Sequence, residues 1–108
     1  MLFRSGLTFR SYRIYNNYVE IEFDEAKREW TLRERSLDFA KAGQISDTYA
    51  LTQEDLREDY GEDRYLTLGV LDGQVVVCVW TQRGEARRII SLRKAEKDER
   101  EAYNLYRP

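Results

Sequence analysis

Five short stretches of the chain combine apolar residues with alternation or with turn signals at their ends, and these patterns predict β-strands. The predicted strands are Val19–Phe23, Thr48–Thr52, Arg64–Leu71, Gln74–Arg83 and Ala86–Arg93. Asp72-Gly73 lies between two of them and favours a tight hairpin turn. Val75–Trp80 is apolar on both faces, which predicts a central strand that is covered on both sides.

The first helix is predicted from about Glu25 to Arg35. Asp24 suits its N-cap, because an aspartate side chain accepts a hydrogen bond from a free amide of the first turn. Ala26 and Trp30 are expected on the inner side of this helix. Trp80 and the single cysteine, Cys78, are likewise interpreted as core residues.

A second, short helix is predicted over Leu37–Ile45, and a third from about Ala95 to Leu105. In the second helix three apolar residues are expected to point inward: Phe39, Ala42 and Ile45. The element order predicts an α+β fold, with an N-terminal strand, two helices, an antiparallel meander and a C-terminal helix. Residues 19–108 are predicted to be a single domain. Residues 1–18 are interpreted as an extension that is flexible or loosely docked, or as the product of an over-called start codon.

The composition excludes several classes of site. The chain has one cysteine and no histidine, so it lacks the residues of a disulfide framework, a zinc site or a Ser-His-Asp triad. Its glycines are scattered and form no phosphate-binding loop. Acidic residues 53–63 lack the spacing of a calcium loop. We therefore expect no cofactor and no metal, and the absence of a signal or membrane segment predicts a cytoplasmic protein.

The net charge is only −2, but the charges are unevenly placed. Residues 53–63 carry six acids against one arginine, whereas residues 83–94 carry five cations against one glutamate. A local basic patch can bind nucleic acid even when the total charge is near zero. The alternative is an exposed or edge strand whose charges prevent aggregation.

Arginine and lysine are the residues left to carry chemistry. Cleavage of RNA by its own 2′-hydroxyl needs a base, an acid and cations that stabilise the phosphate, and arginine suits the last role. A carboxylate, a lysine or a tyrosine can move the protons. The candidate cations are Lys27, Arg64, Arg83, Arg88, Arg93 and Lys94.

Strand pairing places some of these candidates. The antiparallel hairpin makes Arg64 and Arg83 neighbours. Strict alternation along the last strand places Arg87, Ile89, Ser91 and Arg93 on one face and Arg88, Ile90, Leu92 and Lys94 on the other. In the last helix Glu99 falls on the apolar, inward stripe. It is either a catalytic carboxylate or the structural partner of a strand arginine.

Three segments together resemble the BrnT-type toxins. They are F-D-E-A-K-R-E-W-T-L-R-E-R-S-L-D-F-A (23–40), R-Y-L-T-L-G-V-L-D-G-Q-V-V-V-C-V-W-T-Q-R-G (64–84) and R-I-I-S-L-R-K-A-E-K-D-E-R (88–100). The combination of R-I-I-S-x-R-K-A with the upstream R-Y-x-x-x-G and T-x-R-G is specific. The resemblance covers about Val19 to Tyr103.

The resemblance implies a RelE-like fold and a ribonuclease toxin of a type II toxin–antitoxin pair. Such a toxin inhibits translation by cleaving RNA without a metal. It is blocked in a hetero-oligomer by a BrnA-type antitoxin, through which the complex binds operator DNA. The implied active residues are Lys27, Arg64, Arg83, Ser91, Arg93 and Lys94, with Glu99 in support. Arg35 and Arg88 are the further predicted RNA-binding residues.

The chain departs from the family pattern at the end of the first helix. Relatives commonly read N-x-x-K-H-G there, and this chain has Thr31, Glu34, Arg35 and Ser36 in place of the asparagine, lysine, histidine and glycine. Arginine stays protonated and cannot replace a proton-transferring histidine. One alternative is therefore a catalytically attenuated toxin that acts through antitoxin binding and promoter control. Composition alone leaves a third, a small RNA-binding or structural domain.

Overall fold

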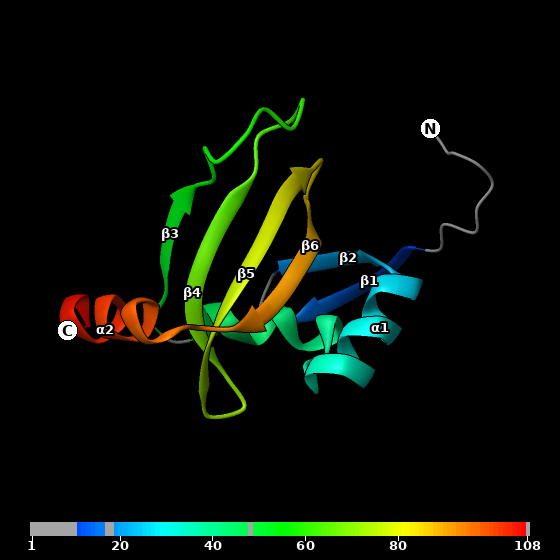
Figure 1. Cartoon of the computed structure of the whole chain (residues 1–108). Coiled ribbons are helices and arrows are strands. Elements are labelled where there is room, and N and C mark those ends of the chain that lie inside the picture. The colour runs from blue at the N-terminus through cyan, green and yellow to red at the C-terminus, as the bar shows by residue number, and fades with distance from the viewer. Residues whose placement is uncertain (1–10, 17–18, 48, 108) are drawn as a thin grey trace.

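The computed structural model describes residues 11–16, 19–47 and 49–107 (Figure 1). In chain order the elements of this part are β1 (Ser11–Asn16), β2 (Val19–Asp24), α1 (Glu25–Arg35), the 3₁₀ helix η2 (Phe39–Asp47), β3 (Leu51–Glu54), β4 (Tyr65–Leu71), β5 (Gln74–Arg83), β6 (Ala86–Lys94) and α2 (Lys97–Tyr106).

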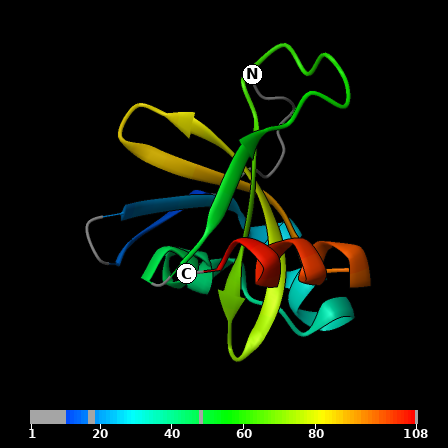
Figure 2. The same ribbon diagram turned by 90° about the vertical axis from the view of Figure 1, so that its left-hand side faces the viewer.

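The strands form one mixed sheet in the order β1-β2-β6-β5-β4-β3. Neighbouring strands are antiparallel except β2 and β6, which run parallel. The predicted α+β class is confirmed, and β4, β5 and β6 form the predicted antiparallel meander. β5 is central, as expected, with Val76–Thr81 buried. Figures 1 and 2 show α1 and α2 at opposite ends of the sheet, and the β3–β4 loop and β5–β6 turn at the same end.

The N-terminal part of the chain contributes an edge strand that the sequence did not predict. β1 pairs with β2 along its whole length, from Ser11 opposite Asp24 to Asn16 opposite Val19. The structure therefore differs from the expectation of a flexible or loosely docked segment at residues 11–16, which form a paired strand. That expectation rested on residues 1–16, whose Arg- and Tyr-rich sequence has no clear periodicity. Residues 1–10 and 17–18 lie outside the described residues, and a domain boundary at residue 18 stays a prediction.

Helix α1 has the predicted bounds and cap. The Asp24 carboxylate accepts a hydrogen bond from the Ala26 amide at 3.0 Å. The predicted inner side is wrong, because Ala26 is exposed and Trp30 is 46% exposed, whereas Thr31 is buried. Thr31 is the one buried residue described in this polar helix. Arg28 ties the helix to the turn that follows it, because its Nε donates a hydrogen bond to Asp38 Oδ1 at 2.7 Å.

The predicted second helix is a 3₁₀ helix that starts two residues later than expected, and β3 starts three residues later. The three inward residues of this helix are confirmed as buried: Phe39, Ala42 and Ile45. η2 crosses β4 at Gly69, where a Cβ atom would overlap Ile45 Cγ2. A glycine suits this crossing because a Cβ atom would force Ile45 to shift, and glycine in a strand often marks such a close approach.

The core lies between η2 and one face of the sheet. Trp80 donates a hydrogen bond from its ring nitrogen to Thr67 Oγ1 at 2.9 Å. Burial raises the pKa of the Cys78 thiol to about 12, so it stays protonated as a core residue. The cluster comprises Ile21, Phe23, Leu37, Phe39, Ala42, Ile45, Leu71, Val76, Cys78, Trp80, Ile89 and Leu92.

A β-bulge interrupts the pairing of β5 with β6. Trp80 pairs with Ile89, but its neighbour Val79 pairs with Ser91. Ile90 is therefore an extra residue in β6. A bulge of this kind re-aims the side chains that follow it.

The bulge changes which β6 residues share a face. Strict alternation predicted Ile89, Ser91 and Arg93 together, and this prediction is wrong beyond the bulge. Leu92 joins Ile89 in the core instead. Ser91 and Arg93 lie on the opposite face, as Arg88 does, because each pairs with a β5 residue that points away from the core.

Helix α2 begins two residues later than predicted, and two glutamates cap its N-terminus. Glu96 and Glu99 form a capping box, each side chain accepting from the other's backbone amide. Tyr103 is buried, and its hydroxyl donates to the Tyr49 carbonyl oxygen at 2.8 Å. This tyrosine is therefore a packing residue that ties α2 to the chain before β3.

Candidate functional site: an arginine-rich sheet face beside helix α1

Most of the predicted active residues converge on the side of the sheet opposite the core. Alternate residues of β5 point away from the core, and three of them pair with residues of β6. These pairs are Val77 with Arg93, Val79 with Ser91 and Thr81 with Arg88. Arg83 follows on the same side of β5 by alternation. Arg64 precedes the first residue of β4, whose ring packs on the core, so Arg64 also lies on the far side. We name this surface the arginine face and define it by Arg64, Arg83, Arg88, Ser91 and Arg93.

Arg64 and Arg83 are joined by a single carboxylate. The Glu62 side chain lies 3.0 Å from Arg64 Nε and 3.6 Å from an Arg83 terminal nitrogen. The prediction that the hairpin makes these arginines neighbours is confirmed. The Arg64 guanidinium also lies 4.2 Å from the centroid of the Tyr60 ring. Arg83 remains 52% exposed, so this pair of cations is accessible to a ligand.

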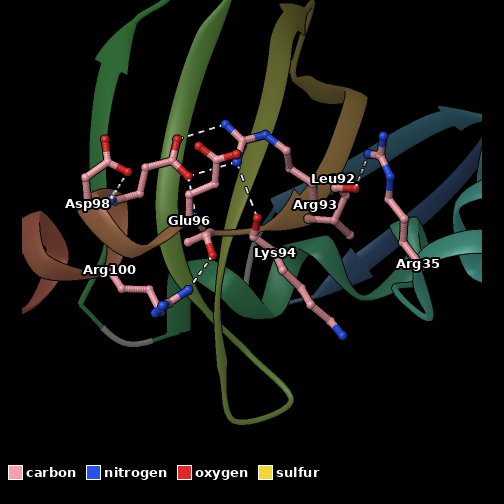
Figure 3. A network of polar contacts seen from close by, with 9 residues as sticks. Arg35, Leu92, Arg93, Lys94, Glu96, Asp98 and Arg100 are labelled. Carbon is pink, nitrogen blue, oxygen red and sulfur yellow. Dashed lines mark hydrogen bonds and ion pairs between the residues drawn. The ribbon is translucent and has the colours of Figure 1, made fainter.

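Arg93 is held by Glu99 of helix α2 (Figure 3). Its two terminal nitrogens donate to the two carboxylate oxygens at 2.8 Å each. The hydrogen bonds from Arg93, together with one from the Glu96 amide, lower the pKa of Glu99 to about 2. The predicted alternative, pairing of Glu99 with a strand arginine, is confirmed. Glu99 stays ionised near neutral pH and so orients Arg93 rather than donating a proton.

Arg88 is the least accessible member of the arginine face. It is 8% exposed and lies 3.0 Å from the carboxylate of Glu22 in the parallel strand β2. Both side chains are 10% exposed. Removing one partner of such a pair leaves an uncompensated buried charge and is strongly destabilising. The geometry suits Arg88 to supporting the sheet more than to contacting a ligand.

A groove of about 330 Å³ runs between α1 and β6, beside the arginine face. Lys27, Trp30, Arg35 and Ser91 line it together with apolar residues, among them Ile90 at the bulge. Arg35 donates from a terminal nitrogen to the Leu92 carbonyl oxygen at 3.0 Å. The groove therefore brings three predicted site residues, one lysine, one arginine and one serine, next to each other.

Lys27 is electrostatically tuned by this environment. Its pKa is lowered from the ordinary value, first by partial burial and further by the positive charges of Arg64 and Arg88, while Asp24 acts in the opposite direction. The shift brings the amine closer to the range in which a lysine can exchange a proton. Arg64 and Arg88 of the arginine face are therefore close enough to Lys27 to act on its pKa.

Lys94 is not brought to the site. It pairs with Val76, whose side chain belongs to the core side of β5. Figure 3 shows its side chain pointing away from the guanidinium of Arg93. Strict alternation had separated Lys94 from Arg93, and the two residues remain on different faces.

Sequence reasoning missed a further arginine–carboxylate unit, which lies in the β3–β4 loop. Asp55 is 6% exposed and accepts from Arg57 Nε at 2.7 Å and from an Arg57 terminal nitrogen at 2.6 Å. The Asp55 amide donates to the Arg64 carbonyl at 2.8 Å, which continues the β3–β4 ladder and places Asp55 on the side of Arg64. The one sequence signal was the lone cation in an acidic loop.

Within the described part of the chain, no three carboxylate, thiol or imidazole side chains gather as a metal-ion site would require. In the same residues no helix is long and apolar enough to cross a bilayer.

The fold and the site define a small α+β protein whose sheet presents grouped arginines beside a cationic groove. Residues 23–99 match a family model described as the ribonuclease toxin BrnT of type II toxin–antitoxin systems. This chain belongs to the BrnT family, which confirms the resemblance seen in its motifs. Membership identifies a ribonuclease toxin with an antitoxin protein as its partner. No curated protein matches the chain.

Proposed function

We propose that this protein is a RelE-like endoribonuclease that cleaves RNA without a metal and thereby inhibits translation in the cytoplasm. The observation that carries the proposal is the convergence of Arg64, Arg83, Ser91 and Arg93 on one sheet face next to Lys27. Guanidinium groups bind phosphate in bidentate fashion and stabilise the charge that develops on it. The RNA 2′-hydroxyl loses its proton and attacks the adjacent phosphorus, and the P–O bond to the 5′-oxygen breaks. The 5′-oxygen leaves with a proton, so the products are a cyclic phosphate and a free 5′-hydroxyl.

The proposed roles follow from exposure and charge. Arg83 and Arg93 bind RNA phosphates at separate points of the arginine face, because Arg93 pairs with Val77, six residues or roughly 20 Å from Arg83 along β5. Arg83 binds the scissile phosphate, and Arg64 supports it through the shared Glu62. Lys27 is the group that moves protons, because it lines the groove beside Ser91, and desolvation there lowers its pKa. Ser91 holds the substrate by a hydrogen bond. Glu99 positions Arg93.

We further propose that a BrnA-type antitoxin blocks this face in a hetero-oligomer, and that the complex contacts operator DNA through the antitoxin alone. Under this proposal the toxin needs no DNA-binding site of its own.

The first test is cleavage of a plain transcript by the purified protein in EDTA, with and without the antitoxin. The expected result is cleavage that survives EDTA and stops when the antitoxin is added. An Arg83→Ala variant should cleave RNA more slowly, because it loses a phosphate contact. The control Arg33→Ala changes an exposed arginine of α1 and should cleave at the rate of the wild type. Cleavage that requires a divalent ion would refute the mechanism.

A catalytically attenuated toxin is the second candidate, and Arg35 favours it. Arg35 stands where relatives commonly carry histidine, and its guanidinium donates to the Leu92 carbonyl. Restoring a general acid or base is worth roughly 10²–10⁴ in rate. Arg35→His should therefore raise RNA cleavage strongly if the natural protein is attenuated. Unchanged cleavage would remove this position from proton transfer.

A further inference from the structure

Trp30 is an exposed tryptophan in a position that its packing does not explain. It is 46% exposed, whereas Trp80 is 8% exposed and hydrogen-bonded within the core. Tryptophan is on average a highly buried residue, so an exposed indole beside a groove is an informative exception. The helix that carries it exposes one other large apolar side chain, Leu32 at 43%, among the described residues, and Leu32 does not line the groove.

The indole forms one wall of the cationic groove between α1 and β6. Lys27, Arg35 and Ser91 line the same groove, and none of its lining side chains within the described part of the chain is a carboxylate. The volume of about 330 Å³ falls at the lower end of the range for small-ligand sites, roughly 300–1,000 Å³. A ligand suited to this groove carries negative charge next to a flat apolar group.

Arg35 orients the Trp30 ring. The guanidinium carbon lies 5.0 Å from the ring centroid. The same guanidinium is fixed to the strand by its hydrogen bond to the Leu92 carbonyl oxygen at 3.0 Å. The ring is therefore held in place from one side while nearly half of the residue stays open to solvent, and a pre-oriented aromatic surface costs less entropy when a ligand stacks on it.

We propose that Trp30 is a nucleobase-stacking residue, and that the α1–β6 groove binds one unpaired base of the RNA while Lys27 and Arg35 hold the adjoining phosphate. This inference rests on the proposed ribonuclease function and adds a base-binding subsite to it. Aromatic side chains stack on unpaired RNA bases with little dependence on sequence. The subsite therefore selects single-stranded RNA over a duplex.

The test uses the full chain without its antitoxin and short 2′-O-methyl RNAs, which cannot be cleaved by 2′-hydroxyl attack. Trp30→Ala should weaken binding on the order of 10- to 100-fold, which corresponds to the loss of one stacked base. The slope of log K against log salt should not change, because no phosphate contact is lost. Tyr106→Ala removes an aromatic residue that is 66% exposed on α2, outside the groove, and should bind like the wild type.

The decisive comparison uses a series of RNAs, each of which has a single abasic nucleotide at a different position. At one position the abasic RNA should bind the wild type as weakly as Trp30→Ala binds the intact RNA, and the two changes should not add. Trp30→Phe should retain much of the affinity, which separates stacking from misfolding. Binding of intact RNA should also quench tryptophan fluorescence in the wild type and not in Trp30→Phe, since Trp80 is buried.

The inference is wrong if Trp30→Ala binds intact RNA like the wild type, or if the variant and every abasic change act additively. Loss of antitoxin affinity with unchanged RNA affinity would make Trp30 a protein-docking residue instead. If the wild type binds no RNA of any kind, the proposed function fails first and the subsite fails with it.

Discussion

At the residue scale, the end of helix α1 has an unusual backbone conformation for the residue that it carries. Ser36 follows the helix in the left-handed conformation, with φ 59° and ψ 33°, and its amide donates to the Leu32 carbonyl at 3.1 Å. Glycine is the usual residue at such a helix end, because it has no Cβ to clash. The serine therefore occupies a position that strains its backbone and that glycine would occupy without strain.

Ser36→Gly should stabilise the protein by about 1 kcal/mol, because it relieves this strain. Thermal unfolding should report a midpoint raised by roughly 4–8 °C. Arg33→Gly, inside the same helix, is the matched control and should lower the midpoint, since glycine is unfavourable in a helix interior. A lowered midpoint for Ser36→Gly would show that the serine side chain makes a contact more valuable than the strain.

Glu99 makes the free energy of unfolding depend on pH in the acidic range. Its pKa is about 2 in the folded protein against an ordinary 4.5, chiefly because Arg93 donates to it. A carboxyl with a lowered pKa contributes stability that is complete above the unfolded value and lost as the pH falls through the folded value. The loss from this group should therefore occur between about pH 4.5 and pH 2.

Glu99→Gln should cost about 1.5–3 kcal/mol at pH 7, the range for hydrogen bonds to charged groups. The difference between variant and wild type should shrink as the pH falls toward 2, where the wild-type carboxyl is also neutral. Urea unfolding at several pH values measures both effects. A difference that is constant with pH would contradict the assigned ion pair.

At the scale of elements, the contact of η2 with β4 depends on one glycine. Gly69→Ala should destabilise the protein by about 1–3 kcal/mol, the usual cost of overpacking, because the new methyl group overlaps Ile45 Cγ2 and lies 3.2 Å from the Ile45 carbonyl oxygen. Denaturant unfolding of Gly69→Ala, Ile45→Ala and the double variant checks this. The double variant should be more stable than the sum of the single costs predicts. Strict additivity would mean that the two residues are not in contact.

The elements also show where sequence patterns stop being informative. Asp24 and the bounds of α1 were predictable, because a cap acts within a few residues. The Asp72-Gly73 hairpin was predictable for the same reason, and Asp72 indeed has a positive φ of 50°. β1 was not, because its partner β2 supplies the order that its own pattern lacks. Trp30 was assigned to the core from spacing alone, although the helix exposes it.

At the scale of the whole molecule, the arginines of the site are balanced by carboxylates from other elements. Glu22, Glu62 and Glu99 each pair with members of the arginine face. The face is thereby organised without a large net charge. RNA must compete with these carboxylates for the guanidinium groups, and Glu62 is the one that lies in a loop.

Glu62→Gln should therefore strengthen RNA binding several-fold, because it removes the charge that competes for Arg64 and Arg83. Binding titrations with an uncleavable RNA at low and moderate salt measure the change, which should be largest at low salt. Glu58→Gln, an exposed acid in the same loop, is the matched control and should have a smaller effect. Equal effects of the two variants would show that only the net charge of the loop matters, and that Glu62 does not compete with RNA for the two arginines.

Arg83→Ala should weaken RNA binding and reduce the slope of log K against log salt by about 0.7, the value for one phosphate contact on a single strand. Arg83 is chosen because its side chain is 52% exposed, so that its removal should leave stability nearly unchanged. Arg33, whose side chain is 65% exposed on α1, is the matched control and should leave the slope unchanged as alanine. An unaltered slope in Arg83→Ala would exclude this residue from the phosphate contacts.

The sequence by itself determined the local elements and the family, because capping, turn chemistry and short motifs act over a few neighbouring residues. It also identified most of the cations of the candidate site. Only the tertiary structure decided which of them meet. The extra residue Ile90 turns Ser91 and Arg93 to the side of Arg88, and the parallel pairing of β2 with β6 brings Glu22 to that side. Such placements depend on strand register, which is set by packing between segments far apart in the chain.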